Sequence, residues 1–116
     1  MTPYLLCLML GSTVPDSWFK ALSEFESGHN PRAIGRYGEV GRYQLMPKFV
    51  RRGLSVEASS RAEANKRWDQ FVKQHGRNPS PFEFYGLWHR PARVWNLKPV
   101  ERDRAKRFEN LVKQQQ

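Results

Sequence analysis

The chain has 116 residues, enough for one small domain and too few for a second binding module. It carries 20 Lys and Arg against 11 Asp and Glu, a formal net charge of +9, which favours polyanionic partners such as nucleic acid, anionic lipid or bacterial cell wall. The single cysteine, Cys7, excludes an intramolecular disulfide framework, so the domain must be held together by packing.

The N-terminal segment contains a short apolar run, residues 4–10, followed by small residues. It resembles a secretory signal without the basic n-region, and it is too short to span a bilayer, which takes about 20 apolar residues. We assign residues 1–13 either to a signal or to a segment packed on the domain, and residues 14–116 to the domain itself. If the segment acts in export, the protein is periplasmic or extracellular.

Helical patterns occupy most of the rest of the chain. Apolar spacing predicts a helix over 15–27 that stops at Gly28, and residues 31–41 are rich in glycine, which suits tight turns or a short hairpin. A second, short helix is expected to begin within 41–47, with Pro47 forcing either a break or a new start. Capping boxes at 60–63 and 80–83 predict two more helix starts, and a last helix begins at about Pro99.

No sustained alternation of apolar and polar residues and no internal repeat occurs in the chain. The sequence therefore predicts an all-α fold, with at most a minor β-hairpin.

Glu26 is the strongest candidate for chemistry. It follows Leu22 by four residues and Phe19 by seven, so it shares the apolar face of the first predicted helix. Desolvation there favours the protonated carboxyl, which a general acid for glycosidic cleavage requires. The alternative is that Glu26 pairs with a basic neighbour such as Arg42.

Three stretches around and after Glu26 resemble a known family. Residues 26–33 read Glu-Ser-Gly-His-Asn-Pro-Arg-Ala, and residues 38–47 read Gly-Glu-Val-Gly-Arg-Tyr-Gln-Leu-Met-Pro. They are similar to the motifs Glu-Ser-x-x-Asn-Pro-x-Ala and Gly-Ala-x-Gly-Leu-Met-Gln-x-Met-Pro of the soluble lytic transglycosylase domain in the lysozyme-like superfamily. Residues 86–91, Gly-Leu-Trp-His-Arg-Pro, correspond loosely to the family's third motif, Ala-Tyr-Asn-Ala-Gly-Pro.

This resemblance implies a small, lysozyme-like helical domain that cleaves peptidoglycan glycan strands. Glu26 would match the catalytic acid, Ser27 the serine that helps to orient the site, and Gln44 the glutamine that lines the sugar cleft. In that family one carboxyl protonates the oxygen between N-acetylmuramic acid and N-acetylglucosamine. Its conjugate base then takes the proton of the muramic C6 hydroxyl, which closes on C1 to give a 1,6-anhydro product.

The chain also departs from the family pattern. Arg and Tyr replace Leu and Met at positions 42 and 43, which makes the cleft floor more polar and cationic, and Glu39 stands where the family has Ala. Of the third motif only the proline is kept. The further candidate substrate-binding residues are Tyr43, Glu39, His89 and Tyr85, the last of which is alternatively a core aromatic.

Glu39 has two interpretations. If it faces Glu26 across the cleft, it holds a water for inverting hydrolysis, at a carboxyl separation of roughly 6.5–9.5 Å. Otherwise it is a loop acid bonded to Arg36 or Arg42.

Two further functional classes remain open beside a muramidase. One is a non-catalytic wall-binding protein on the same fold. The other is a basic nucleic-acid-binding domain, which rests on net charge alone. The histidines lack metal-ligand spacing, so we expect no metal and no cofactor, and we expect a monomer that binds glycan strands, with no nucleic-acid partner and no membrane span.

Overall fold

The computed structural model describes residues 13–91 and 95–115. Its helices are α2 (Asp16–Ser27), the short 3₁₀ helix η1 (Pro47–Phe49), α3 (Val56–His75), α4 (Pro81–His89) and α5 (Pro99–Gln115). Over these ranges the only β structure is a pair of isolated antiparallel bridges, Ile34 to Val40 and Val40 to Leu45. The predicted all-α fold with a minor hairpin is confirmed.

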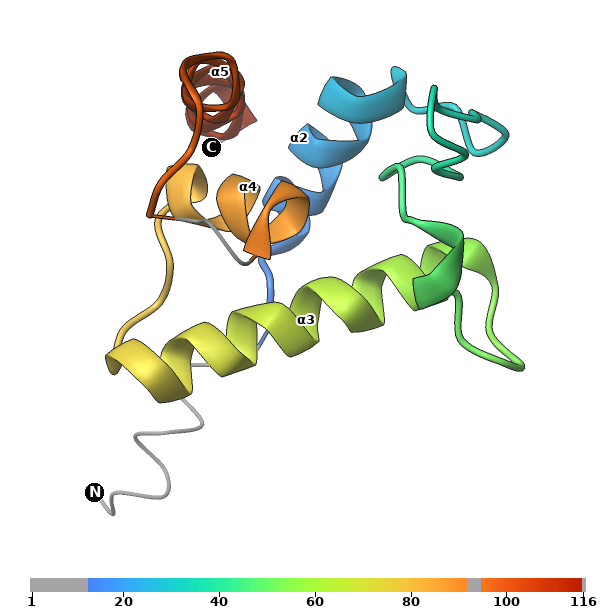
Figure 1. Ribbon diagram of the computed structural model, residues 1–116, viewed down its shortest axis with the longest axis horizontal. Helices are drawn as coiled ribbons and strands as arrows, with labels where there is room; N and C mark the ends of the chain where they lie inside the picture. The colour runs from blue at the N-terminus through green and yellow to red at the C-terminus, as the bar shows by residue number, and fades with distance from the viewer. Residues whose placement is uncertain (1–12, 92–94, 116) are drawn as a thin grey trace.

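The helices pack around one aromatic core. α5 lies against α2 and α4, and α4 also contacts α3, the long helix that crosses the molecule in Figure 1. The Trp18 ring meets Trp68 edge-on at 5.2 Å and Phe84 at 5.7 Å between centroids, and Phe84 continues to Phe108 at 6.1 Å. These contacts join all four α-helices in a single core.

Three helix boundaries agree closely with the sequence pattern. α2 ends where Gly28 takes a left-handed conformation with φ 62°, which glycine adopts without strain. α4 begins with the predicted capping box, because Ser80 Oγ accepts from Glu83 N at 3.1 Å and the Glu83 carboxylate accepts from Ser80 N at 2.9 Å. α5 begins at Pro99, as expected.

The predicted capping box at 60–63 is wrong. α3 begins at Val56, capped by Ser55, whose hydroxyl accepts from Ala58 N at 3.0 Å. Ser60 lies within the helix and donates to the Val56 carbonyl at 2.8 Å. The helix starts earlier than predicted because Ser55 already caps it, which leaves residues 60–63 inside the helix.

The short helix predicted to begin within 41–47 is also wrong. Gly41 and Gln44 both have positive φ, 84° and 54°, which interrupts the helical hydrogen-bond series. Leu45 instead pairs with Val40 through backbone bonds of 2.9 and 3.0 Å, and η1 starts afresh at Pro47. Residues 28–46, hereafter the 28–46 loop, thus form an irregular hairpin beyond the end of α2 (Figure 1).

The N-terminal segment assigned to export or packing falls on residues 1–12, outside the described residues, apart from Thr13, which is exposed. Within the described ranges no helix has both the length and the apolar character needed to cross a bilayer.

Candidate functional site

A cleft of about 550 Å³ lies between the end of α2, the 28–46 loop and the end of α4. Glu26 enters it from the last turn of α2, Glu39 and Gln44 from the loop, and His89 from the last residue of α4. Residues far apart in the chain therefore meet at one concave surface, the usual setting for a binding site.

Glu26 is nearly shielded from water. Its side chain is 6% exposed, and its Oε1 contacts His89 Nε2. Arg42 is not its partner: the Arg42 guanidinium donates to the His29 carbonyl at 2.9 Å and lies 3.8 Å from the Glu57 carboxylate of α3. The predicted alternative, that Glu26 pairs with a basic neighbour, is wrong for Arg42, but Glu26 does pair with the basic side chain of His89, and both side chains line the cleft.

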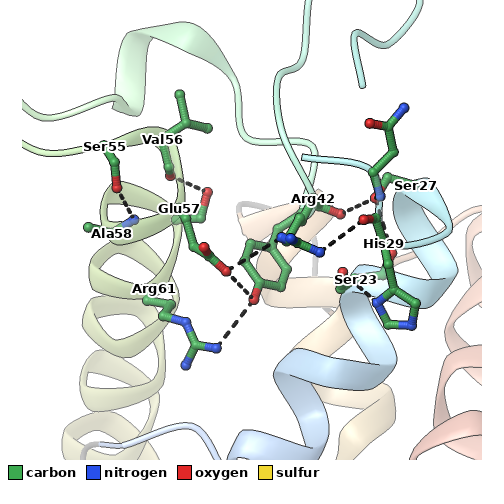
Figure 2. A network of polar contacts seen from close by, with 12 residues as sticks. Ser23, Ser27, His29, Arg42, Ser55, Val56, Glu57, Ala58 and Arg61 are labelled. Atoms are coloured by element: carbon green, nitrogen blue, oxygen red, sulfur yellow. Dashed lines mark hydrogen bonds and ion pairs between the residues drawn. The ribbon is translucent and has the colours of Figure 1, made fainter. Parts of the chain in front are cut away.

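Ser27 lies behind the cleft wall and holds the 28–46 loop to α2. Its hydroxyl donates to the Arg42 carbonyl at 2.8 Å and accepts from Asn30 N at 3.1 Å. Figure 2 shows how Arg42 continues this connection, reaching from the backbone of His29 to Glu57 on α3. A serine next to the acid thus fixes the loop that forms the opposite side of the site.

Gln44 lines the cleft in a constrained conformation. With φ 54° it is one of two non-glycine residues with positive φ among those described, and such strain persists only where the surroundings enforce it. Its amide nitrogen donates to the carbonyls of Gly41 at 3.0 Å and Ala33 at 3.4 Å. The side chain therefore holds the hairpin together while it forms part of the cleft surface.

Glu39 also lines the cleft, but its bonding differs from the expectation. Its Oε1 accepts from the backbone nitrogen of Tyr37 at 2.7 Å. Among the described contacts it forms no ion pair with Arg36 or Arg42, so that predicted pairing is wrong. The loop is polar enough to satisfy the carboxylate with its own backbone.

Gly35 supports both loop side chains, a role that the sequence pattern did not single out. A Cβ at this position would lie 2.8 Å from Glu39 Oε2 and would collide with Gln44 Oε1. Because Gly35 has no side chain, the side chains of Glu39 and Gln44 can pack against its backbone.

Tyr43 does not line the cleft. It is buried, its hydroxyl lies 3.3 Å from Glu57 Oε1 and 3.4 Å from Arg61, and its carbonyl accepts from Trp88 Nε1 at 2.9 Å. Burial raises the pKa of its hydroxyl, which leaves it neutral. Tyr43 thus braces the cleft wall from behind.

Tyr85 is likewise buried behind the wall. Its ring packs against His89 at 4.4 Å and against Phe25 at 5.5 Å, and its hydroxyl accepts from Arg104 Nε at 2.8 Å. Burial, and then the charge of Glu26, raise the pKa of Tyr85 to about 12. This position favours the core-aromatic interpretation, with Tyr85 a neighbour of the acid through His89.

Four permanently charged side chains also line the cleft: Lys48, Arg67, Arg90 and Arg104. The sequence pattern predicted none of them as a site residue. Arg67 is the most enclosed, since it binds Glu63 at 2.9 Å and donates to the carbonyls of Leu87 and Trp88 at 2.9 and 2.8 Å. In the sequence, Glu63 precedes Arg67 by four residues, a spacing that favours an ion pair on one face of a helix. Because Glu63 pairs with Arg67 and Glu101 with Arg90, Lys48 and Arg104 are the lining cations without a carboxylate partner among the described contacts, and they could attract an anionic ligand.

In the part of the chain that the structure describes, no three His, Cys, Asp or Glu side chains gather in a way that could hold a metal ion. The chain matches no protein-family model, no curated protein and no solved structure.

Proposed function

We propose that the chain is a peptidoglycan-cleaving enzyme that acts on the bond between N-acetylmuramic acid and N-acetylglucosamine, with Glu26 as its single catalytic acid. One observation carries the proposal: Glu26, from the first of the three stretches that resemble the lytic transglycosylase motifs, shares a cleft with residues from the other two. Motif positions separated by up to 65 residues, from Glu26 to Pro91, line one surface.

The chemistry needs one carboxyl in two protonation states. Protonated Glu26 gives its proton to the bridging oxygen as the bond from muramic C1 breaks, and the leaving sugar departs with a hydroxyl. The Glu26 carboxylate then takes the proton of the muramic C6 hydroxyl while that oxygen bonds to C1. Glu26 ends protonated, a 1,6-anhydro sugar is formed and no water is consumed. General acid–base catalysis of this kind contributes about 10²–10⁴-fold.

The charge of the cleft fits this substrate. Glycan strands carry carboxylates on muramic acid or its peptide stems, and Lys48 and Arg104 lie exposed along the cleft to attract them. A periplasmic or extracellular location, where the wall lies, follows from the same proposal.

Hydrolysis through Glu39 is the second candidate, favoured by the presence of Glu39 in the same cleft. One of its oxygens accepts from Tyr37 N, and the other packs over Gly35. These contacts occupy the carboxylate that would activate a water, and for this reason we favour the single-acid reaction.

The test is mass spectrometry of fragments released from purified cell wall by the wild type and by Glu39→Gln. We expect 1,6-anhydro ends in both. If the wild type releases fragments with reducing ends and Glu39→Gln does not, the enzyme is a hydrolase that uses Glu39 and not the proposed lyase. Co-sedimentation with the wall and no released fragment would contradict cleavage altogether and favour a wall-binding protein.

A further inference from the structure

We infer that His89 is a positioning residue for Glu26: its Nε2–H donates to Glu26 Oε1 and leaves the second carboxyl oxygen to carry the reacting proton. This inference rests on the proposed function of Glu26. The contact joins the last turn of α2 to the last residue of α4, and both side chains line the cleft.

The imidazole of His89 is held in place from behind. Its ring packs on Tyr85, one helical turn earlier, at 4.4 Å between centroids and an interplanar angle of 35°. Tyr85 is itself fixed by the Arg104 bond to its hydroxyl. At 28% exposure the His89 side chain still reaches the cleft, so the ring presents one nitrogen to Glu26 in a restricted orientation.

The chemistry of the reaction selects the tautomer. An Nε2–H donor satisfies Glu26 Oε1 whether the carboxyl is protonated or ionised. An unprotonated Nε2 would instead accept the acid's own hydrogen, which would direct the reacting proton away from the sugar. Only the Nε2–H form serves both halves of a reaction in which Glu26 first gives and then takes a proton.

The first test is kinetic, with His89→Ala, His89→Gln and the control His75→Gln, which changes a histidine at the far end of α3. We expect kcat of His89→Ala to fall about 10- to 100-fold, the loss of one hydrogen bond to a charged group, with KM within about twofold. His89→Gln, whose amide also donates, should recover part of kcat. His75→Gln should keep the wild-type kcat.

The second test is independent of activity. Nitrogen-15 NMR of the wild-type imidazoles reports the tautomer, and we expect Nε2–H for His89. An Nδ1–H tautomer of His89 or an unchanged kcat in His89→Ala would each overturn the inference. If the wild type releases no fragments, the proposed function fails, whereas the NMR result still decides the direction of the His89 to Glu26 bond.

Discussion

The indole nitrogen of Trp88 donates to the backbone carbonyl of Tyr43 at 2.9 Å, across 45 residues of sequence. Trp88 belongs to α4, which also carries His89, and Tyr43 precedes Gln44 in the 28–46 loop. The bond is buried and joins two walls of the cleft. The bond between Trp88 and Tyr43 therefore helps to fix the position of His89 relative to Gln44, although it involves neither side chain.

Trp88→Phe should weaken both the fold and the site. The Tyr43 carbonyl would be left buried without its donor, a cost of about 1–3 kcal/mol in the free energy of unfolding, measurable by urea denaturation. Wall cleavage should fall further than stability alone explains. The matched control is Trp18→Phe, which makes the same change in the core away from the cleft; equal loss of cleavage in both variants would contradict the role of the bond.

Gly35→Ala should disturb the loop side of the cleft. A methyl group there collides with Gln44 and lies 2.8 Å from Glu39 Oε2, so both side chains must move. Because the atoms that must move are the far ends of two flexible side chains, we expect a loss of at most about 1 kcal/mol by thermal unfolding and a raised KM for glycan fragments.

The control for Gly35→Ala is Gly38→Ala in the same hairpin. Gly38 has φ 87° and open space around its Cα, so alanine costs about 1–2 kcal/mol of backbone strain without a collision. Its KM should stay near the wild-type value. A raised KM in Gly38→Ala alone would disprove the steric account.

Glu83 should make stability depend on acid pH. The hydrogen bond from Arg77 lowers its pKa to about 2 against the opposing effect of burial, with a further contribution from Ser80 N. Because the folded pKa lies below the ordinary value of about 4.3, its contribution is present above that pH and is lost as pH falls towards 2. Glu83→Gln keeps the cap but loses the ion pair, so it should be about 1 kcal/mol less stable at pH 7.

The measurement for Glu83 is the free energy of unfolding of both proteins between pH 7 and about pH 2. The difference between wild type and Glu83→Gln should shrink as the pH falls. A difference that stays constant over this range would show that the charge of Glu83 contributes nothing.

Tyr85 should affect stability at alkaline pH. Its pKa in the folded protein is raised to about 12 by burial and then by Glu26, against about 10 in an unfolded chain. The unfolded state therefore loses this proton first, and the contribution of Tyr85 to stability, complete below pH 10, declines as pH rises towards 12. The stability of the wild type relative to Tyr85→Phe should fall over that interval; a parallel pair of curves would contradict the shift.

Local features of the structure were accessible to sequence reasoning. Gly28 and Ser80 marked helix ends because capping depends on a few adjacent residues. The spacing from Phe19 and Leu22 placed Glu26 on the buried side of α2, and its side chain is 6% exposed. These predictions succeeded since each depends on contacts within two helical turns.

Tertiary contacts were not accessible in the same way. His89 lies 63 residues from Glu26, and the residue pattern around neither of them predicts that their side chains are in contact. The left-handed conformation of Gln44 was unpredictable for a different reason, because non-glycine residues adopt it rarely and only when tertiary contacts enforce it. The resemblance indicated Glu26 and Gln44, which line the cleft, but also Ser27, which lies behind its wall; the partners of all three depend on tertiary packing.

The central claim is tested most directly by the rate at which Glu26→Gln releases fragments from purified cell wall. Glu24→Gln is the matched control, because Glu24 is exposed and lies two residues earlier on α2. We predict that Glu26→Gln folds like the wild type and cleaves about 100-fold more slowly or not at all, while Glu24→Gln cleaves normally. Cleavage by folded Glu26→Gln at the wild-type rate would contradict the assignment of Glu26 as the catalytic acid.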